Sequence, residues 1–139
     1  MSRGLNIADD FLLFAIEIKD QLEARQTGKY KVTLTQGVLR TCISRAYYAA
    51  FLYARRVTNL ERYRRPIGIK RVSIHNTVID RLKEMGIPVA DMLYNLKKAR
   101  GKADYNIYST ITPNKVIWAV KVAQQIIDFL KRAFPNKFQ

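Results

Sequence analysis

An arginine and an aspartate one helical turn apart are the residues whose spacing points most directly to chemistry. Arg100 interrupts a series of apolar residues at helical spacing, where a leucine would serve packing better. Asp104 lies four residues later, so its carboxylate can pair with the guanidinium and limit the cost of burying a charge. Two interpretations stay open. The pair either fixes the helix internally, or the arginine lies at the floor of a cleft and binds a phosphate with two hydrogen bonds.

A second arginine lies among small and aromatic residues in the string SRAYYAAF, residues 44–51. Arginine interleaved with aromatic rings is typical of surfaces that stack bases and bind phosphates. This pattern makes Arg45 and Tyr48 candidates for nucleic-acid contact. The alternative is that the tyrosines are core residues with their hydroxyl groups at the rim.

The chain has one histidine, His75, so any acid–base chemistry that depends on an imidazole must use it. The alternative is a structural or solvent-facing histidine near a helix start. The sequence has no HxxxH, CxxC or close carboxylate cluster, and we therefore expect no metal site. Phosphate-loop, dinucleotide-binding and hydrolase-elbow motifs are also missing from the sequence, and no cofactor is expected.

The charge balance favours a polyanionic partner. There are 25 Lys and Arg residues against 11 Asp and Glu, a net charge of +14, which exceeds what solubility requires. The segment 62–71 is strongly basic and is the best candidate for long-range attraction of phosphate; its alternative interpretation is a solvated run of charges. The candidate phosphate contacts in this segment are Arg64, Arg65, Lys70 and Arg71.

Five helical patterns must position these residues. They cover about residues 6–25, 35–57, 73–85, 88–107 and 112–134. Ser73 and Thr112 are predicted N-caps, Pro88 suits the first position of the fourth helix, and Gly86 ends the third. The apolar residues of the last helix cover more than one stripe, which predicts a central helix or one shared with another subunit.

Length and composition predict one domain over residues 1–139. Hydrophobic residues make up 48% and charged residues 26%, as in ordinary globular proteins. The single cysteine, Cys42, cannot form an internal disulfide, which fits the reducing cytoplasm. No stretch approaches the ~20 apolar residues of a membrane span, and the N-terminal residues do not resemble a signal peptide.

The strings SRAYYAAFLYARR (44–56) and LYNLKKARGKADYN (93–106), with His75 between them, resemble the HEPN domain, the higher eukaryotes and prokaryotes nucleotide-binding domain. The resemblance extends from about Ile7 to Phe134. It implies an all-α, up-and-down bundle of four to five helices, frequently a homodimer with a cleft between subunits. It also implies action on RNA or nucleotides, often as a metal-independent RNase, and in many relatives a toxin–antitoxin pair with a small nucleotidyltransferase partner.

The RNase branch of that family has a histidine after its arginine, with four to six residues between them, and this sequence departs from the pattern. Arg100 falls on the family's arginine, but an RxKADY-type string with Asp104 and Tyr105 stands where the histidine is expected. A tyrosine with a pKa near 10 is a poor base at neutral pH, unlike an imidazole with a pKa near 6.5. The candidate catalytic residues are therefore Arg100, Asp104, Tyr105 and His75, with no base assigned.

Two functions of different classes follow. In the first, a helical bundle binds RNA or a nucleotide, with Arg100 and Arg45 on phosphate and Tyr48 and Tyr105 on a base or ribose. Cleavage in such a site would be a metal-free transesterification in which arginine stabilises the charged phosphorane. In the second, the protein is a non-catalytic interaction module whose last helix docks a partner or a second copy.

Overall fold

The computed structural model describes residues 3–26, 35–61 and 73–138, and these residues contain helices and no strand. The described part of the chain holds five α-helices and a short 3-10 helix. They are α1 (Arg3–Gln26), α2 (Gln36–Val57), α3 (Ile74–Glu84), α4 (Ala90–Tyr105), α5 (Pro113–Ala133) and η1 (Pro135–Lys137). The all-α prediction is confirmed.

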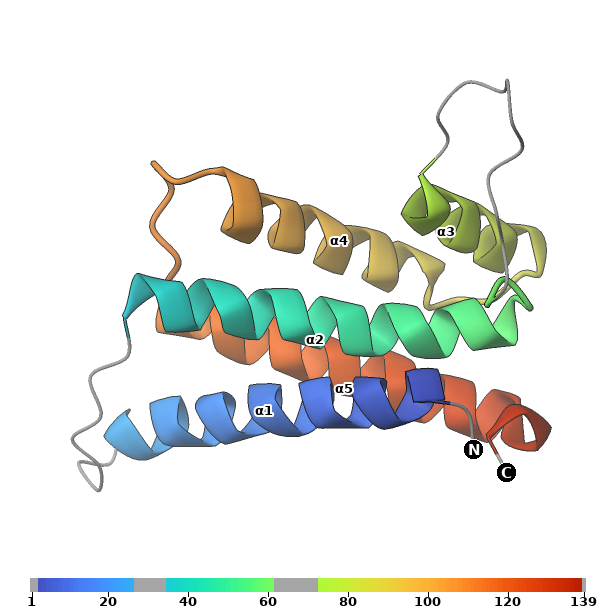
Figure 1. Cartoon of the computed structure of the whole chain (residues 1–139), viewed down its shortest axis with the longest axis horizontal. Coiled ribbons are helices and arrows are strands. Elements are labelled where there is room, and N and C mark those ends of the chain that lie inside the picture. Colours follow the sequence, from blue (N-terminus) through green and yellow to red (C-terminus); the bar gives the residue numbers. More distant parts are fainter. Residues whose placement is uncertain (1–2, 27–34, 62–72, 139) are drawn as a thin grey trace.

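Helix α2 is the centre of the bundle. It packs against α1, α3, α4 and α5, whereas α1 and α4 lie on opposite sides of it (Figure 1). Helices α1, α2, α4 and α5 run alternately up and down, and α3 packs across the start of α4. The arrangement is the up-and-down bundle expected from the sequence.

Three helices begin at a serine or threonine that satisfies a free backbone N–H of the first turn. The hydroxyl oxygens of Thr35, Ser73 and Thr112 accept from the N–H groups of Val38 (3.3 Å), His75 (3.2 Å) and Lys115 (3.2 Å). The predicted caps Ser73 and Thr112 are confirmed, and α2 opens where the sequence indicated. The cap at Ser73 also fixes the backbone position of His75, because the N–H group from which it accepts belongs to this residue.

Both ends of α4 differ from the prediction. The helix begins at Ala90 and not at Pro88, because Pro88 and Val89 form a turn closed by a 3.3 Å bond from Ala90 N–H to the Ile87 carbonyl. It ends at Tyr105, so Ile107 does not continue the apolar face and is 75% exposed. Gly86, with a φ of 72°, ends the preceding segment as expected.

One side of helix α5 is buried in the apolar core of the bundle. Its fully buried residues are Val116, Ala119, Val120, Ala123, Ile126, Ile127 and Leu130. The second apolar stripe is partly buried and packs against the edge of the same core; it consists of Ile117, Trp118, Val122 and Phe129. No helix in the described ranges is long and apolar enough to cross a membrane.

The connection between α4 and α5 is held by two side chains of α2. The Arg40 guanidinium donates to three backbone carbonyls, those of Ala103 (2.9 Å), Asn106 (3.0 Å) and Ser109. The Gln36 amide donates to the Ile111 carbonyl (2.8 Å) and accepts from the Ile111 N–H (2.9 Å). These contacts fix the C-terminal end of α4, and with it Asp104 and Tyr105, against α2.

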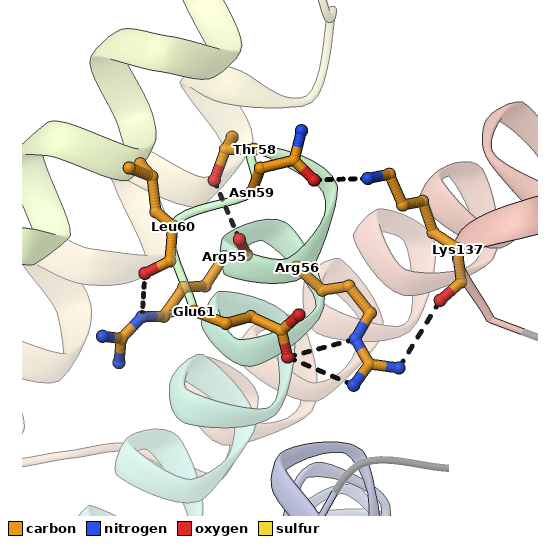
Figure 2. Close-up of polar contacts among 7 residues, drawn as sticks. All are labelled: Arg55, Arg56, Thr58, Asn59, Leu60, Glu61 and Lys137. Carbon is orange, nitrogen blue, oxygen red and sulfur yellow. Dashed lines mark hydrogen bonds and ion pairs between the residues drawn. The ribbon is translucent and has the colours of Figure 1, made fainter. Parts of the chain in front are cut away.

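The C-terminal end of α2 is tied to the end of the chain in a similar way (Figure 2). The Arg56 guanidinium donates twice to one carboxylate oxygen of Glu61, at 3.1 and 3.2 Å, and once to the Lys137 carbonyl at 3.5 Å. The Lys137 ammonium group donates to the side chain of Asn59, whose φ is 60°. The cluster joins η1 to the turn that follows α2.

Candidate functional site

Arg100 lies in the seam between α4 and α2, where its residue is only 8% exposed. Its Nη1 atom is 3.6 Å from Asp104 Oδ2 and donates to the Tyr105 hydroxyl oxygen at 3.3 Å. The contact with Asp104 is long for a charge-assisted hydrogen bond, which is ordinarily 2.7–2.9 Å. The predicted pairing with Asp104 therefore exists, but it is weak for a charge that is buried to this degree.

Three tyrosine rings surround the guanidinium. The Arg100 Cζ atom lies 5.3 Å from the ring centre of Tyr47, 5.5 Å from that of Tyr48 and 5.8 Å from that of Tyr105. Aromatic faces attract a cation through their quadrupoles, and the attraction is stronger where water is excluded. The rings stabilise the charge of Arg100 without accepting its N–H groups.

One guanidinium nitrogen is left without a partner. Arg100 Nε is buried and has no hydrogen-bond partner among the residues that the structure describes. Asp104 cannot compensate fully, because its side chain is 26% exposed and its Oδ2 atom also accepts from the Ser44 hydroxyl at 3.4 Å. An unpaired buried donor is costly, so Arg100 retains hydrogen-bonding capacity that the described residues do not use.

The structure brings His75 to the same tyrosine pair, although 24 residues separate it from Arg100 in the sequence. The His75 ring centre is 5.5 Å from that of Tyr47, 5.8 Å from that of Tyr48 and 4.4 Å from that of Phe51. The Tyr47 hydroxyl and His75 Nδ1 share a 2.7 Å hydrogen bond. No spacing rule links a residue at the start of α3 with one in α4, which is why the sequence did not indicate this proximity.

The surroundings keep the imidazole neutral. Burial, together with the positive charges of Arg100, Lys97 and Arg55, lowers the pKa of His75 to about 4. Burial also raises the pKa of the Tyr47 hydroxyl, so that this group stays protonated. The pair Tyr47 and His75 is consequently an uncharged hydrogen-bonded unit at neutral pH, next to a permanently charged guanidinium.

The two tyrosines of the SRAYYAAF string have different surroundings. Tyr47 is completely buried and belongs to the core, as the second interpretation of this string proposed. Tyr48 is half-buried and packs edge to face with Tyr47 at 5.5 Å between ring centres. Tyr105 is 76% exposed, so of the three rings around Arg100 it is the most accessible to a ligand.

The remaining predicted phosphate contacts are not gathered at Arg100. Arg45 is exposed, and its guanidinium lies 4.7 Å from the ring centre of Phe11 on α1. Arg64, Arg65, Lys70 and Arg71 lie outside the described residues. The structure thus brings together Arg100, Asp104, Tyr105, Tyr48 and His75, and directs Arg45 toward α1.

Charge is distributed unevenly across the bundle. Helix α1 carries five acidic and three basic residues, whereas α2 has four arginines and no acidic residue, and α4 has four basic residues and two acidic ones. Since α1 and α4 lie on opposite sides of α2, the side that carries α4 is the more positive (Figure 1).

The described residues offer no metal site, and one hollow in them lies away from Arg100. They contain no group of three or more His, Cys, Asp and Glu side chains placed to hold a metal ion. A hollow of about 370 Å³ lies at the last turns of α5, lined by Asp128, Lys131 and Arg132, and includes none of the predicted site residues.

Comparison with known protein families identifies the HEPN domain. The family model of the HEPN domain matches residues 25–133, which include α2 to α5 and every residue of the Arg100 site. No match was found among the curated proteins.

Proposed function

Because the chain belongs to the HEPN family, whose domains are nucleotide-binding or RNase-like, we propose that it binds RNA or a nucleotide at Arg100. One observation carries the proposal: a buried guanidinium with an unpaired Nε and only a 3.6 Å contact to its carboxylate. A phosphate offers the acceptor oxygens that this group lacks, in the planar, two-pronged geometry that arginine favours.

The neighbouring side chains suit the rest of a nucleotide. Tyr105 is exposed and its hydroxyl already contacts Arg100, so a base or ribose of the bound nucleotide stacks on its ring or binds its hydroxyl. Tyr48 forms the half-buried wall of the same seam. The net charge of +14 attracts the polyanion from a distance.

Our proposal extends to a metal-independent cleavage of RNA, for which groups of the same site are the candidates. In that reaction the ribose 2′-oxygen attacks the phosphorus, the bond to the 5′-oxygen breaks, and the leaving oxygen receives the proton that the base took from the 2′-hydroxyl. His75, neutral at pH 7 and hydrogen-bonded at Nδ1 to Tyr47, is our candidate to take the proton of the 2′-hydroxyl, in place of the histidine that follows the arginine in the family's RNases, although a pKa of about 4 makes it a weaker base than an ordinary imidazole. Arg100 stabilises the charge on the phosphorane.

Replacing Arg100 tests the binding proposal. Arg100→Met is expected to weaken binding of a fluorescently labelled single-stranded RNA about 100-fold, because it removes a buried charge–phosphate contact. The measurement is fluorescence anisotropy across a salt series, in buffer with a chelator, followed by electrophoresis to detect cleavage products. The matched control is Arg132→Met, which removes the same charge from an exposed position on α5. Equal affinities of the two variants would contradict the proposal.

A second candidate is a non-catalytic interaction module that forms a homodimer or docks a partner such as a small nucleotidyltransferase of a toxin–antitoxin pair. The observation that favours it is the exposed apolar segment after α4, with Ile107 75% and Tyr108 93% exposed, on a connection fixed by Arg40 and Gln36. The mass in solution after RNase treatment separates the two candidates. A stable dimer without nucleic acid favours the second, and RNA that co-purifies with the chain favours the first.

A further inference from the structure

The solvent face of α4 carries an alternation of aromatic and basic side chains. Tyr94, Lys98, Lys102 and Tyr105 follow one another at spacings of four, four and three residues, which places them along one side of the helix. All four are exposed, Tyr94 by 42% and Tyr105 by 76%. We call these four residues the α4 stripe.

The packing of α4 fixes the direction of this stripe. The opposite side of the helix is buried in the core through Leu93, Leu96, Ala99 and Ala103. The helix is also held at its C-terminal end by Arg40, which donates to the carbonyls of Ala103 and Asn106. The stripe is therefore presented to solvent on a rigid support, and a ligand does not need to order it.

Lysines surround the tyrosine at the N-terminal end of the stripe. The Lys98 ammonium group lies 5.0 Å from the ring centre of Tyr94, and that of Lys83, from α3, lies 5.7 Å from it. Lys83 is also paired with the carboxylate of Asp91, at 3.9 Å. Lys98 and Lys102 have no carboxylate partner within the described part of the chain, so their charges are available to an anion.

We propose that the α4 stripe is a binding track for a single-stranded polynucleotide, in which Tyr94 and Tyr105 stack bases and Lys98 and Lys102 neutralise phosphates. Alternating rings and cations are the arrangement by which proteins bind single strands without reading their sequence. The inference rests on the proposed function, because the track begins at Tyr105, whose hydroxyl contacts Arg100.

The length of the stripe fits a polynucleotide better than a mononucleotide. Tyr105 lies eleven positions after Tyr94, which at 1.5 Å per residue is about 16 Å. A stacked single strand has one phosphate per about 3.4 Å, so about five nucleotides span this distance. A second copy of the chain fits less well, because a symmetric contact would place the lysines of one stripe against those of the other.

Binding of oligonucleotides of increasing length tests the track. With labelled oligouridylates of two to twelve nucleotides, we expect the affinity of the wild-type chain to rise steeply up to about five nucleotides. The double variant Lys98→Gln/Lys102→Gln is expected to lower the slope of log K against log salt by about 1.4, since each phosphate contact on a single strand contributes about 0.7. Tyr94→Leu, which removes a stacking ring, is expected to weaken binding of the longer oligomers about tenfold.

The control is Lys121→Gln/Lys131→Gln, which removes the same charge from exposed positions on α5. The proposal of the track would be overturned if the salt slope fell equally in both double variants. It would also be overturned if the wild-type chain were a dimer and the stripe variants were monomers. Arg100→Met measured on the dinucleotide separates this failure from that of the proposed function. If Arg100→Met alone loses affinity, the track is rejected and the Arg100 site stands; if no variant loses affinity, both are rejected. Oligodeoxynucleotides of the same lengths show whether the track binds DNA as well as RNA.

Discussion

Two arginines bridge α2 and α4, and their surroundings are opposite in kind. Arg40 reaches from α2 to the end of α4, where its guanidinium donates to three carbonyl oxygens that the helix end and the following connection leave free. Arg100 reaches from α4 toward α2 and meets three aromatic faces, one hydroxyl and a carboxylate at 3.6 Å. One group completes the backbone hydrogen bonding of the fold, and the other is left incompletely bonded.

The two arginines differ in how many of their N–H groups find an acceptor, and the more deeply buried of the two, Arg100, is the less completely bonded. Arg56 belongs with Arg40, because its guanidinium is shared between Glu61 and the Lys137 carbonyl (Figure 2). Arg100 keeps a buried Nε without a partner in the described residues. Since buried polar groups are nearly always paired, such an exception calls for a partner that the described residues do not supply, and we propose that a phosphate is this partner.

The largest effect on stability is expected at Arg40. Arg40→Met removes a charged donor from three carbonyl oxygens and is expected to lower the free energy of unfolding by about 2–4 kcal/mol. Urea denaturation followed by circular dichroism measures this change, with Arg132→Met as the control for loss of an exposed cation. A loss below about 1 kcal/mol would place Arg40 among the ordinary surface cations and remove the contrast with Arg100.

A smaller effect is expected on the pKa of His75, to which the two arginines contribute differently. The positive charge of Arg100 contributes to the lowered pKa of this imidazole, next to burial, whereas Arg40 is not among the groups that shift it. Arg100→Met is therefore expected to raise the pKa of His75 from about 4 toward its ordinary value, and Arg40→Met to leave it unchanged. Titration of the imidazole by nuclear magnetic resonance measures both. An equal pKa in both variants would mean that the charge of Arg100 does not contribute to the lowered pKa of His75.

The same pKa gives the direction of the pH dependence of stability. Between pH 6.5 and about 4 the unfolded chain binds a proton at His75 that the folded chain does not. The contribution of His75 to stability is thus complete above pH 6.5 and is lost as the pH falls toward 4. In His75→Gln this part of the pH dependence is absent. Comparing the free energy of unfolding against pH for the wild type and for His75→Gln therefore separates the contribution of His75 from that of the carboxylates.

The helices are predictable from the sequence because the signals that mark them, periodicity and capping residues, lie within the helices or next to them. Periodicity located all five helices, and the hydroxyl groups of Ser73 and Thr112 marked two of their starts. The start of α4 was placed two residues early, because Pro88 fits a turn before a helix as readily as the first helical position. The end of α4 was placed late, because the apolar character of Ile107 could not reveal that Asn106 ends the helix.

The candidate site was predictable only in part. Arg100 and Asp104 were found because a charge within an apolar helical line is visible in the sequence. The bond between Tyr47 and His75, and the position of both beside Arg100, depend on how α3 packs against α2 and α4, which no local pattern records. Arg40 and Gln36 were missed for the same reason, since their partners lie more than sixty residues away.

The smallest expected effect is the one that decides between the two interpretations of Arg100. If the ion pair with Asp104 existed for stability, Arg100→Met would cost about 3–5 kcal/mol, as the loss of one partner from a buried pair does. We expect a change within about 1 kcal/mol, because Asp104 is partly exposed and keeps the Ser44 hydroxyl. A methionine also fills the space among the three tyrosine rings favourably. A variant that folds as stably as the wild type but no longer binds RNA means that the charge of Arg100 serves the ligand and not the fold.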